Sequence, residues 1–184
     1  KFSLDGKHLI VAYFRHANIF SIDSLKFNSI RLKHSDNIIT VNFNAKKTRA
    51  VTTGMDKVAK IWNARKGTQL CELRHNDWVN FAYFFDDDTK LITATRNGEI
   101  HFWDSQSGSE IYSPIKTNNR ILNVEYQQLT EKLILTTENG VSQVWEISDP
   151  LSPICALDHD DWLNVAAFNS EHNTLITGGN NNQA

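Results

Sequence analysis

The sequence predicts an all-β fold built from repeated four-stranded units, and three series of residues in one register predict it. Tryptophans recur at Trp62, Trp103 and Trp145, spaced by 41 and 42 residues. Histidines and first-strand aromatic residues repeat this spacing or its double. They are His34, His75 and His159, and Phe2, Phe43, Phe84, Tyr126 and Phe168. A fixed period of this length is typical of repeat architectures, so the 184 residues divide into units of about 42.

The second unit shows how each repeat divides into strands. Four short runs rich in β-branched and aromatic residues are bounded by Asn, Asp, Gly and Lys. These predicted strands span 38–43, 49–53, 58–62 and 68–73. Asn97-Gly98 and Asn139-Gly140 are the strongest hairpin signals, because such turns require positive φ. The chain shows no convincing helical period over the length that a helix needs.

Four short strands per repeat, joined by hairpins, form the unit of a β-propeller blade. The chain then comprises about 4.4 blades, within the usual propeller range at its lower end. The predicted ranges are an incomplete blade at 1–33, whole blades at 34–74, 75–116 and 117–158, and an incomplete blade at 159–184. A closed four-bladed ring would duplicate a second strand, because residues 8–13 and 173–177 both supply it. We therefore expect a segment of a larger ring.

These motifs resemble those of the WD-repeat proteins, and the resemblance covers essentially the whole chain. Trp103-Asp104 is the pair that names the family, and its equivalents are Trp62-Asn63, Trp145-Glu146 and the degenerate Phe20-Ser21. The family's histidine stands 28 residues before the tryptophan, as His34 does before Trp62. The family's turn aspartate stands six residues before it, where Asp56 is found. The resemblance implies a ring that most often has seven blades.

The resemblance also implies hydrogen-bonded sets of side chains inside the blades. The chemistry agrees, because a buried indole N–H needs an acceptor, and a threonine hydroxyl or a neutral imidazole both donates and accepts. The predicted members are His34, Thr52, Asp56 and Trp62; His75, Thr93, Asn97 and Trp103; Asn139 and Trp145; and His159. In the fourth unit Thr117 replaces the histidine and Leu135 replaces the threonine. A catalytic His–Asp pair is the alternative, but repetition from blade to blade favours a structural role.

Sequence motifs of catalysis and metal binding give no candidate active site. G-x-S-x-G, H-E-x-x-H, P-loop and C-x-x-C motifs are missing from the sequence. Cys71 and Cys155 fall on fourth strands two blades apart, which argues against a disulfide or a shared metal. The run Asp86-Asp87-Asp88 suggests Ca²⁺, but it lies at a predicted hairpin turn, where aspartate is common. We expect no cofactor, no metal and no enzymatic activity.

Composition narrows the classes of partner. The net charge of −2 and the pI of about 6.4 give no basic footprint for nucleic acid. No apolar run reaches the length of about 18–20 residues that a membrane span needs. Two cysteines make no disulfide framework, so a reducing compartment, and hence the cytoplasm, is the expected location.

In the resembled fold, the loop after the repeat histidine and the turn between the second and third strands lie on one face. Candidate partner-binding residues there are Asn37, Trp78, Arg96, Arg120, Glu138 and Trp162. Trp and Arg match the residue bias of binding hot spots. The alternative that Trp78 and Trp162 cover the ends of their own blades has equal weight. The expected function is a non-catalytic scaffold that binds proteins or peptides, or other domains of the same full-length chain. The alternatives are a sensor or regulatory propeller of a larger signalling kinase or ATPase and, less favoured, a channel-site enzyme.

Overall fold

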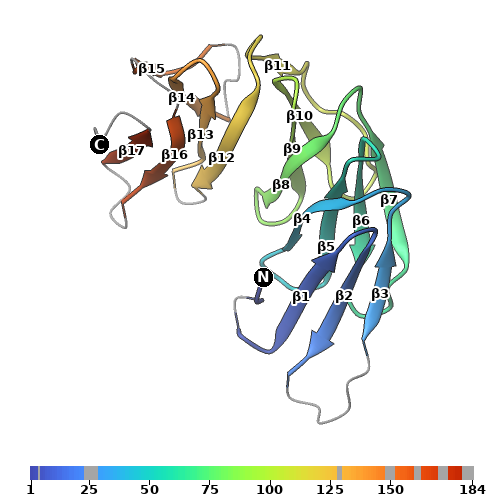
Figure 1. The fold of residues 1–184 in the computed structure, drawn as a ribbon. Coiled ribbons are helices and arrows are strands. Elements are labelled where there is room, and N and C mark those ends of the chain that lie inside the picture. The colour runs from blue at the N-terminus through green and yellow to red at the C-terminus, as the bar shows by residue number, and fades with distance from the viewer. Residues whose placement is uncertain are drawn as a thin grey trace. The chain divides into compact units, whose positions relative to one another are not determined.

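The computed structural model describes residues 1–3, 5–22, 29–127, 130–147, 152–159, 163–169 and 174–179. Its named elements are all strands, β1 to β17, coloured along the chain in Figure 1. The predicted fold class is confirmed, because three of the sheets contain four strands each, joined by antiparallel hairpins. In the part of the chain that the structure describes, no helix is long and apolar enough to cross a membrane.

The chain divides into two compact units, which we describe separately. The first contains Lys1–Thr95 and His101–Ser113, and the second contains Arg96–Ile100 and Pro114–Ala184. The first blade has three strands: β1 (His8–Tyr13), β2 (His16–Ser21) and β3 (Ile30–Lys33). The second has four: β4 (Ile38–Phe43), β5 (Arg49–Gly54), β6 (Val58–Asn63) and β7 (Gln69–Arg74). The third also has four, of which β8 (Val79–Phe85), β9 (Lys90–Thr95) and most of β10 (Glu99–Asp104) belong to the first unit, and β11 (Ile115–Lys116) belongs to the second.

Neighbouring blades in the first unit are held together by apolar side chains. The core between the first two blades includes Ile10, Ile19 and Leu32 on one side and Val41, Ala50 and Trp62 on the other. The next core sets Val51, Ile61 and Leu73 against Ala82, Leu91 and Trp103. Trp62 and Trp103 therefore face the blade that precedes their own. The sequence period is thus the period of interblade packing.

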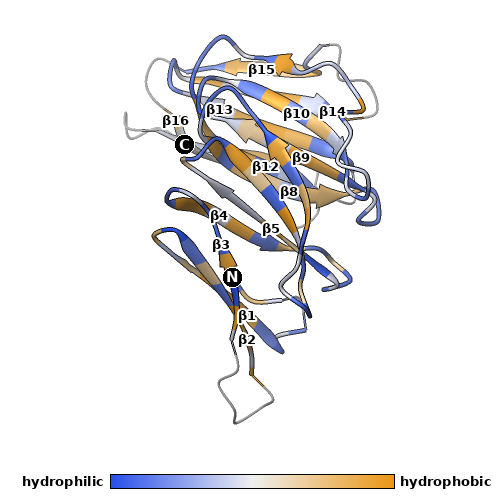
Figure 2. Ribbon diagram, turned by 90° about the vertical axis from the view of Figure 1, so that its right-hand side faces the viewer, coloured by the Kyte–Doolittle hydropathy of each residue, from blue (hydrophilic) through white to orange (hydrophobic). Residues whose placement is uncertain are grey.

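Strands inside this stack are buried on both faces, which explains why the sequence alternates only imperfectly. Five of the six residues of β5 are buried, so its apolar residues form a run instead of alternating with polar ones. The β-branched Val51, Thr52 and Thr53 suit such a strand because they pack well on a pleated surface. Figure 2 shows the hydrophilic residues gathered at the turns and interspersed along the strands.

The second unit contains the fourth blade and a further hairpin. The fourth blade comprises β12 (Ile121–Gln127), β13 (Lys132–Thr137), β14 (Val141–Glu146) and β15 (Cys155–Asp158). The hairpin pairs β16 (Leu163–Phe168) with β17 (Leu175–Gly179). Ile134 and Val144 of the fourth blade and Ala166 of the hairpin share one core. The same face-to-face packing therefore continues in this unit.

The turns after the second strands have the positive φ that the sequence predicts for the Asn-Gly dipeptides. Three of them have three residues, and the last residue of each takes the positive φ. These residues are Lys57 at +64°, Gly98 at +93° and Gly140 at +82°. In the Asn-Gly dipeptides only the glycine has positive φ, so these are not two-residue turns with both residues left-handed. The first blade has a shorter turn, Phe14 and Arg15, with Phe14 at +46°.

Candidate functional site

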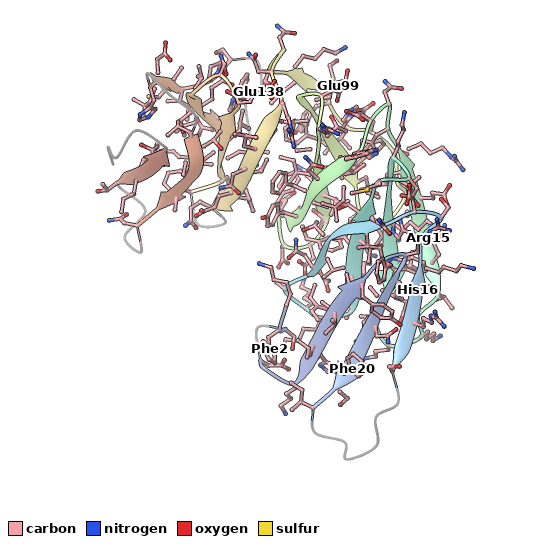
Figure 3. The ribbon with its side chains drawn as sticks, in the orientation of Figure 1. Phe2, Arg15, His16, Phe20, Glu99 and Glu138 are labelled. Atoms are coloured by element: carbon pink, nitrogen blue, oxygen red, sulfur yellow. The ribbon has the colours of Figure 1, made fainter. Side chains whose placement is uncertain are left out.

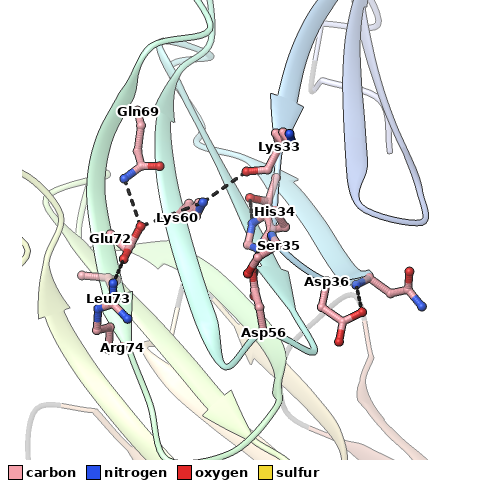
Figure 4. Close-up of polar contacts among 12 residues, drawn as sticks. Lys33, His34, Ser35, Asp36, Asp56, Lys60, Gln69, Glu72, Leu73 and Arg74 are labelled. Carbon is pink, nitrogen blue, oxygen red and sulfur yellow. Dashed lines mark hydrogen bonds and ion pairs between the residues drawn. The ribbon is translucent and has the colours of Figure 1, made fainter.

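Four polar side chains of the second blade form one continuous hydrogen-bonded chain. The indole Nε1 of Trp62 on β6 donates to Thr52 Oγ1 on β5 across 2.8 Å. Thr52 Oγ1 lies 2.6 Å from His34 Nε2, and His34 Nδ1 lies 2.9 Å from Asp56 Oδ2. Asp56 also accepts from the backbone N–H of Ser35 across 3.0 Å. Figure 4 shows how this network ties the loop before β4 to the turn after β5.

The directions of these bonds require a neutral imidazole and an ionised carboxylate. Burial lowers the pKa of His34, and this effect outweighs the opposing influence of Asp56. Partial burial opposes ionisation of Asp56, but hydrogen bonds from His34 and Ser35 prevail and hold the pKa of its carboxyl below the ordinary value. Neutral His34 then donates from Nδ1 and accepts the Thr52 proton at Nε2. Every donor in the chain thus has an acceptor.

The third blade repeats the inner part of this chain. Trp103 Nε1 donates to Thr93 Oγ1 across 2.8 Å, and Thr93 Oγ1 lies 2.8 Å from His75 Nε2. His75 Nδ1 lies 3.1 Å from the carbonyl oxygen of Leu73. Asn97 lies in the turn between β9 and β10. The imidazole of this blade therefore contacts a backbone carbonyl at Nδ1, where the second blade has a carboxylate.

In the fourth blade, which lacks the repeat threonine, a different side chain accepts the hydrogen bond of the tryptophan. Leu135 occupies the threonine position on β13, and its strand partner on β14 is Gln143. The Gln143 side-chain oxygen accepts from Trp145 Nε1 across 3.3 Å. Asn139 accepts from the Thr137 hydroxyl across 2.6 Å within the following turn. Sequence reasoning missed Gln143, although its place two residues before the tryptophan marks it as a neighbour on the same strand face.

The histidine of the last hairpin keeps its threonine. His159 Nε2 lies 3.3 Å from Thr177 Oγ1 on β17, which is the position that Thr52 holds on β5. The distance is longer than in the second and third blades. The same pair of residue types therefore recurs wherever the repeat has both.

The Asp56–His34–Thr52 geometry resembles a nucleophile–base–acid triad, but its environment excludes that role. Thr52 is fully buried, and its oxygen already accepts from Trp62. A nucleophile must reach substrate, and the His34 side chain has no exposed surface. These residues therefore hold the blade together.

The side chain two residues before Trp62 and the one two residues before Trp103 each contact the tryptophan ring, which sequence reasoning missed. Lys60 Nζ lies 5.7 Å from the centre of the Trp62 ring, and the His101 ring stacks on Trp103 with centroids 5.7 Å apart. His101 Nδ1 also lies 2.7 Å from Glu110 Oε1. As Figure 4 shows, Lys60 Nζ donates to the carbonyl of Lys33 across 3.2 Å. Each blade thus supports its tryptophan with a different polar side chain.

The three consecutive aspartates form a left-handed turn between β8 and β9. Their φ values are +51°, +52° and +71°, and Asp88 reaches the neighbouring blade. Its carboxylate accepts from the backbone N–H groups of Ala45 and Lys46, each across 2.9 Å, and from Asn44 Nδ2 across 3.1 Å. Asp88 is therefore a link between blades. Among the described residues, no group of three or more His, Cys, Asp or Glu side chains could hold a metal ion.

The predicted partner-binding residues lie on the loops and turns at the ends of the strands. In the first unit, Asn37 precedes β4 and the partly buried Trp78 precedes β8. In the second unit, Arg96 and Glu138 lie in turns, and the carbonyl of the exposed Arg120 accepts from the Glu138 backbone N–H across 2.9 Å. The sixth residue, Trp162, lies outside the described residues.

One backbone hydrogen bond fixes these loops in the same way in every blade. The residue at the repeat histidine position donates its N–H to the last residue of the turn in the preceding blade. The pairs are His34 to Arg15, His75 to Lys57, Thr117 to Gly98 and His159 to Gly140, at 2.9–3.1 Å. The loops of different blades therefore share this backbone hydrogen bond but differ in their side chains.

Comparison with known proteins agrees with this geometry. The family profile described as "WD domain, G-beta repeat" matches residues 25–63 and 67–104, so its two matches end at Asn63 and Asp104, directly after a repeat tryptophan. The first match joins β3 of one blade to β4–β6 of the next. Each of the two matched repeats therefore contains strands of two neighbouring blades.

Curated relatives cover most of this chain at low identity. Apoptotic protease-activating factor 1 of Homo sapiens is 28% identical over 149 residues, which are 80% of this chain and 11% of that protein. Serine-threonine kinase receptor-associated protein of Mus musculus is 25% identical over 80% of this chain and 42% of its own length. WD repeat-containing protein 91 homolog of Dictyostelium discoideum is 26% identical over 76% of this chain and 19% of its own length. The chain spans less than half the length of each of these relatives. The two profile matches, the repeat period and the four-stranded blades together show that the chain is similar to WD-repeat proteins.

Proposed function

We propose that this chain is a non-catalytic interaction module that binds a protein or peptide partner through the loops before its first strands and the turns after its second strands. WD40 repeats generally mediate protein–protein interactions. The observation that carries the proposal is the burial of the repeat polar side chains. Thr52, Thr93 and His34 are all at most 1% exposed and bonded within their blades. The loop ends are where side chains differ between blades.

The loops suit recognition because their backbone is fixed while their chemistry varies. Asn37, Trp78 and Arg120 each stand three residues after a repeat position, and they offer an amide, an indole and a guanidinium. A rigid frame presents such groups with little loss of conformational entropy on binding, which favours affinity. Trp and Arg are also the residue types enriched at binding hot spots.

A regulatory propeller within a larger signalling protein is the second candidate. Two relatives carry signalling names, an apoptotic protease-activating factor and a kinase receptor-associated protein, and this chain matches 11% and 42% of them. A cytoplasmic location belongs to the same proposal. The full-length reading frame distinguishes the two candidates, because a regulatory propeller requires an attached effector domain.

Site-specific cross-linking in the full-length protein tests the binding face. A photoreactive amino acid at position 78 should cross-link the partner, whereas one at position 106 should not. Gln106 is an exposed residue of the turn after β10, at the opposite end of the blade. With the partner purified, Trp78→Ala should weaken binding by roughly tenfold and Gln106→Ala should leave it unchanged. Equal affinities for these two variants would sink the proposed face.

A further inference from the structure

The turn between β1 and β2 departs from the repeat at one position. Phe14 stands six residues before Phe20, as Asp56 stands before Trp62. In the third and fourth blades this position holds Asn97 and Asn139. A place that is polar in three blades is therefore aromatic in the first.

The backbone at Phe14 is unfavourable for a residue of its kind. Its φ is +46°, in the left-handed region where a bulky L side chain meets steric conflict. Gly98 and Gly140 take the positive φ in the corresponding turns of the third and fourth blades. Glycine would hold the first turn more easily.

The hydrogen bonds that hold the turn at Phe14 are made by its backbone. The turn uses only backbone atoms to hold the next blade: the Phe14 carbonyl accepts from Ile38 N across 2.6 Å, and the Arg15 carbonyl accepts from His34 N across 2.9 Å. The Phe14 side chain is 76% exposed, the largest exposure among the exposed large hydrophobic residues of the described chain. A strained residue that gains so little burial points to a role outside the fold.

The residues next to Phe14 in the sequence and across the strand pair carry aromatic and basic side chains. Tyr13 is 45% exposed, and its ring centroid lies 5.9 Å from that of His16. His16 is the strand partner of both Tyr13 and Lys33. Figure 3 shows Arg15 and His16 at one end of the first blade, with Phe2 and Phe20 toward the other.

The charged side chains that act most strongly on the His16 ring are cationic. Desolvation, and then the positive charges of Arg31, Lys33 and Arg15, lower the pKa of His16. Among the described residues of the first blade, the sole carboxylate side chain is that of Asp5. Asp5 precedes β1 at the far end from the turn, and Lys47 Nζ lies 2.7 Å from it. Carboxylates of a partner would therefore complement charges that the first blade leaves uncompensated.

We propose that Tyr13, Phe14, Arg15, His16 and Lys33, the first-turn surface, bind an acidic peptide segment that carries an apolar anchor residue. The two aromatic rings receive the anchor, and Arg15 and Lys33 pair with flanking carboxylates. An acidic peptide is favoured over nucleic acid because the patch is small and the whole chain carries a net charge of −2, which repels a long polyanion. This inference rests on the proposed function and gives it a partner class and a place on the same face, at the turn of the first blade.

The test measures binding of a fluorescent random copolymer of glutamate and tyrosine to the full-length protein by anisotropy. Phe14→Gly should weaken binding by roughly tenfold while the unfolding temperature stays the same or rises, because glycine tolerates the left-handed turn. Arg15→Glu should weaken binding and reduce its dependence on salt concentration. The matched controls are Leu70→Ala, at a 46% exposed position on β7, and Lys66→Glu, in the turn after β6 at the opposite end. Both controls should bind as the unmodified protein does.

Three outcomes overturn the inference. They are no saturable binding of the copolymer, equal affinity for the unmodified protein and Phe14→Gly, and tighter binding of polyuridylate that the same variants abolish. The last outcome would assign the surface to RNA. If Trp78→Ala weakens binding of the natural partner while Phe14→Gly weakens neither ligand, the proposed function stands and the first-turn surface fails. If Phe14→Gly weakens copolymer binding but Trp78→Ala leaves binding of the natural partner unchanged, the first-turn surface stands and the proposed binding face at Trp78 fails.

Discussion

The His34 imidazole and the Asp56 carboxylate lie 2.9 Å apart, although one belongs to the loop before β4 and the other to the turn after β5. Through Thr52 the same imidazole is joined to Trp62, which lies in the core against the first blade. One network therefore connects a loop, two strands and an interblade core. In the third blade the corresponding His75 ends on a backbone carbonyl. The second blade should accordingly be the most sensitive to changes in these side chains.

Thr52→Val should destabilise the protein by about 2–4 kcal/mol, because it leaves the Trp62 N–H and His34 Nε2 buried without their partner. Thr53→Val is the matched control. Thr53 is the next residue of β5 and equally buried, but its hydroxyl has no hydrogen-bond partner in the structure. That control should be neutral or slightly stabilising. Urea unfolding of both variants measures the difference, and equal losses would contradict the network.

Stability should fall as the pH is lowered through 6.5 because of His34. Burial holds its folded-state pKa below the ordinary value of 6.5, so the unfolded chain binds the proton more tightly. The contribution is complete above 6.5 and is lost as the pH falls toward the folded-state pKa, with a slope of at most about 1.4 kcal/mol per pH unit. Asp56 has a lowered pKa, so its own contribution is lost only below 3.8.

His34→Gln isolates this effect. The variant removes the titrating ring, so its unfolding free energy should change less than that of the unmodified protein between about pH 7.5 and pH 5. The difference between the two slopes removes the contribution of other groups, including the half-buried His16. Identical slopes would show that His34 is not buried in its neutral form.

Asp88→Ala should cost about 1–3 kcal/mol, because it removes the acceptor of three hydrogen bonds from the second blade. Asp87→Ala provides a closely matched control. Both residues have positive φ, so alanine introduces similar backbone strain at each. Asp87 makes an exposed ion pair with Lys46, and its loss should cost less than about 0.5 kcal/mol beyond that strain. Thermal unfolding that ranks the two variants equally would contradict the interblade role of Asp88.

Gly98→Ala should be far more damaging than Gly6→Ala. Both glycines have positive φ, at +93° and +69°. A Cβ at Gly98 would overlap the Asn119 carbonyl oxygen, whereas no atom lies within 4 Å of a Cβ at Gly6. We expect a loss of about 1 kcal/mol for Gly6→Ala and about 3 kcal/mol or more for Gly98→Ala. Denaturant unfolding measures both, and a similar loss at both sites would show that the Asn119 loop yields at little cost.

The fold was predictable because its information is local and repeated. Each strand appears in the sequence as a short β-branched or aromatic run, and the spacing of Trp62, Trp103 and Trp145 sets the unit. The turn positions were predictable for the same reason. The positive φ at Gly98 was predictable too, because an Asn-Gly pair indicates a turn of this kind.

The sequence by itself determined the repeat, the four-stranded blades and the residue types available for hydrogen bonding within each blade. Only the tertiary structure decided that Gln143 accepts from Trp145, that Asp88 receives the N–H groups of Ala45 and Lys46, and that Phe14 is exposed on a left-handed turn. Strand patterns depend on alternation within a few residues. The link made by Asp88 joins residues more than 40 apart, and such contacts exist only once blade packing brings their backbones together.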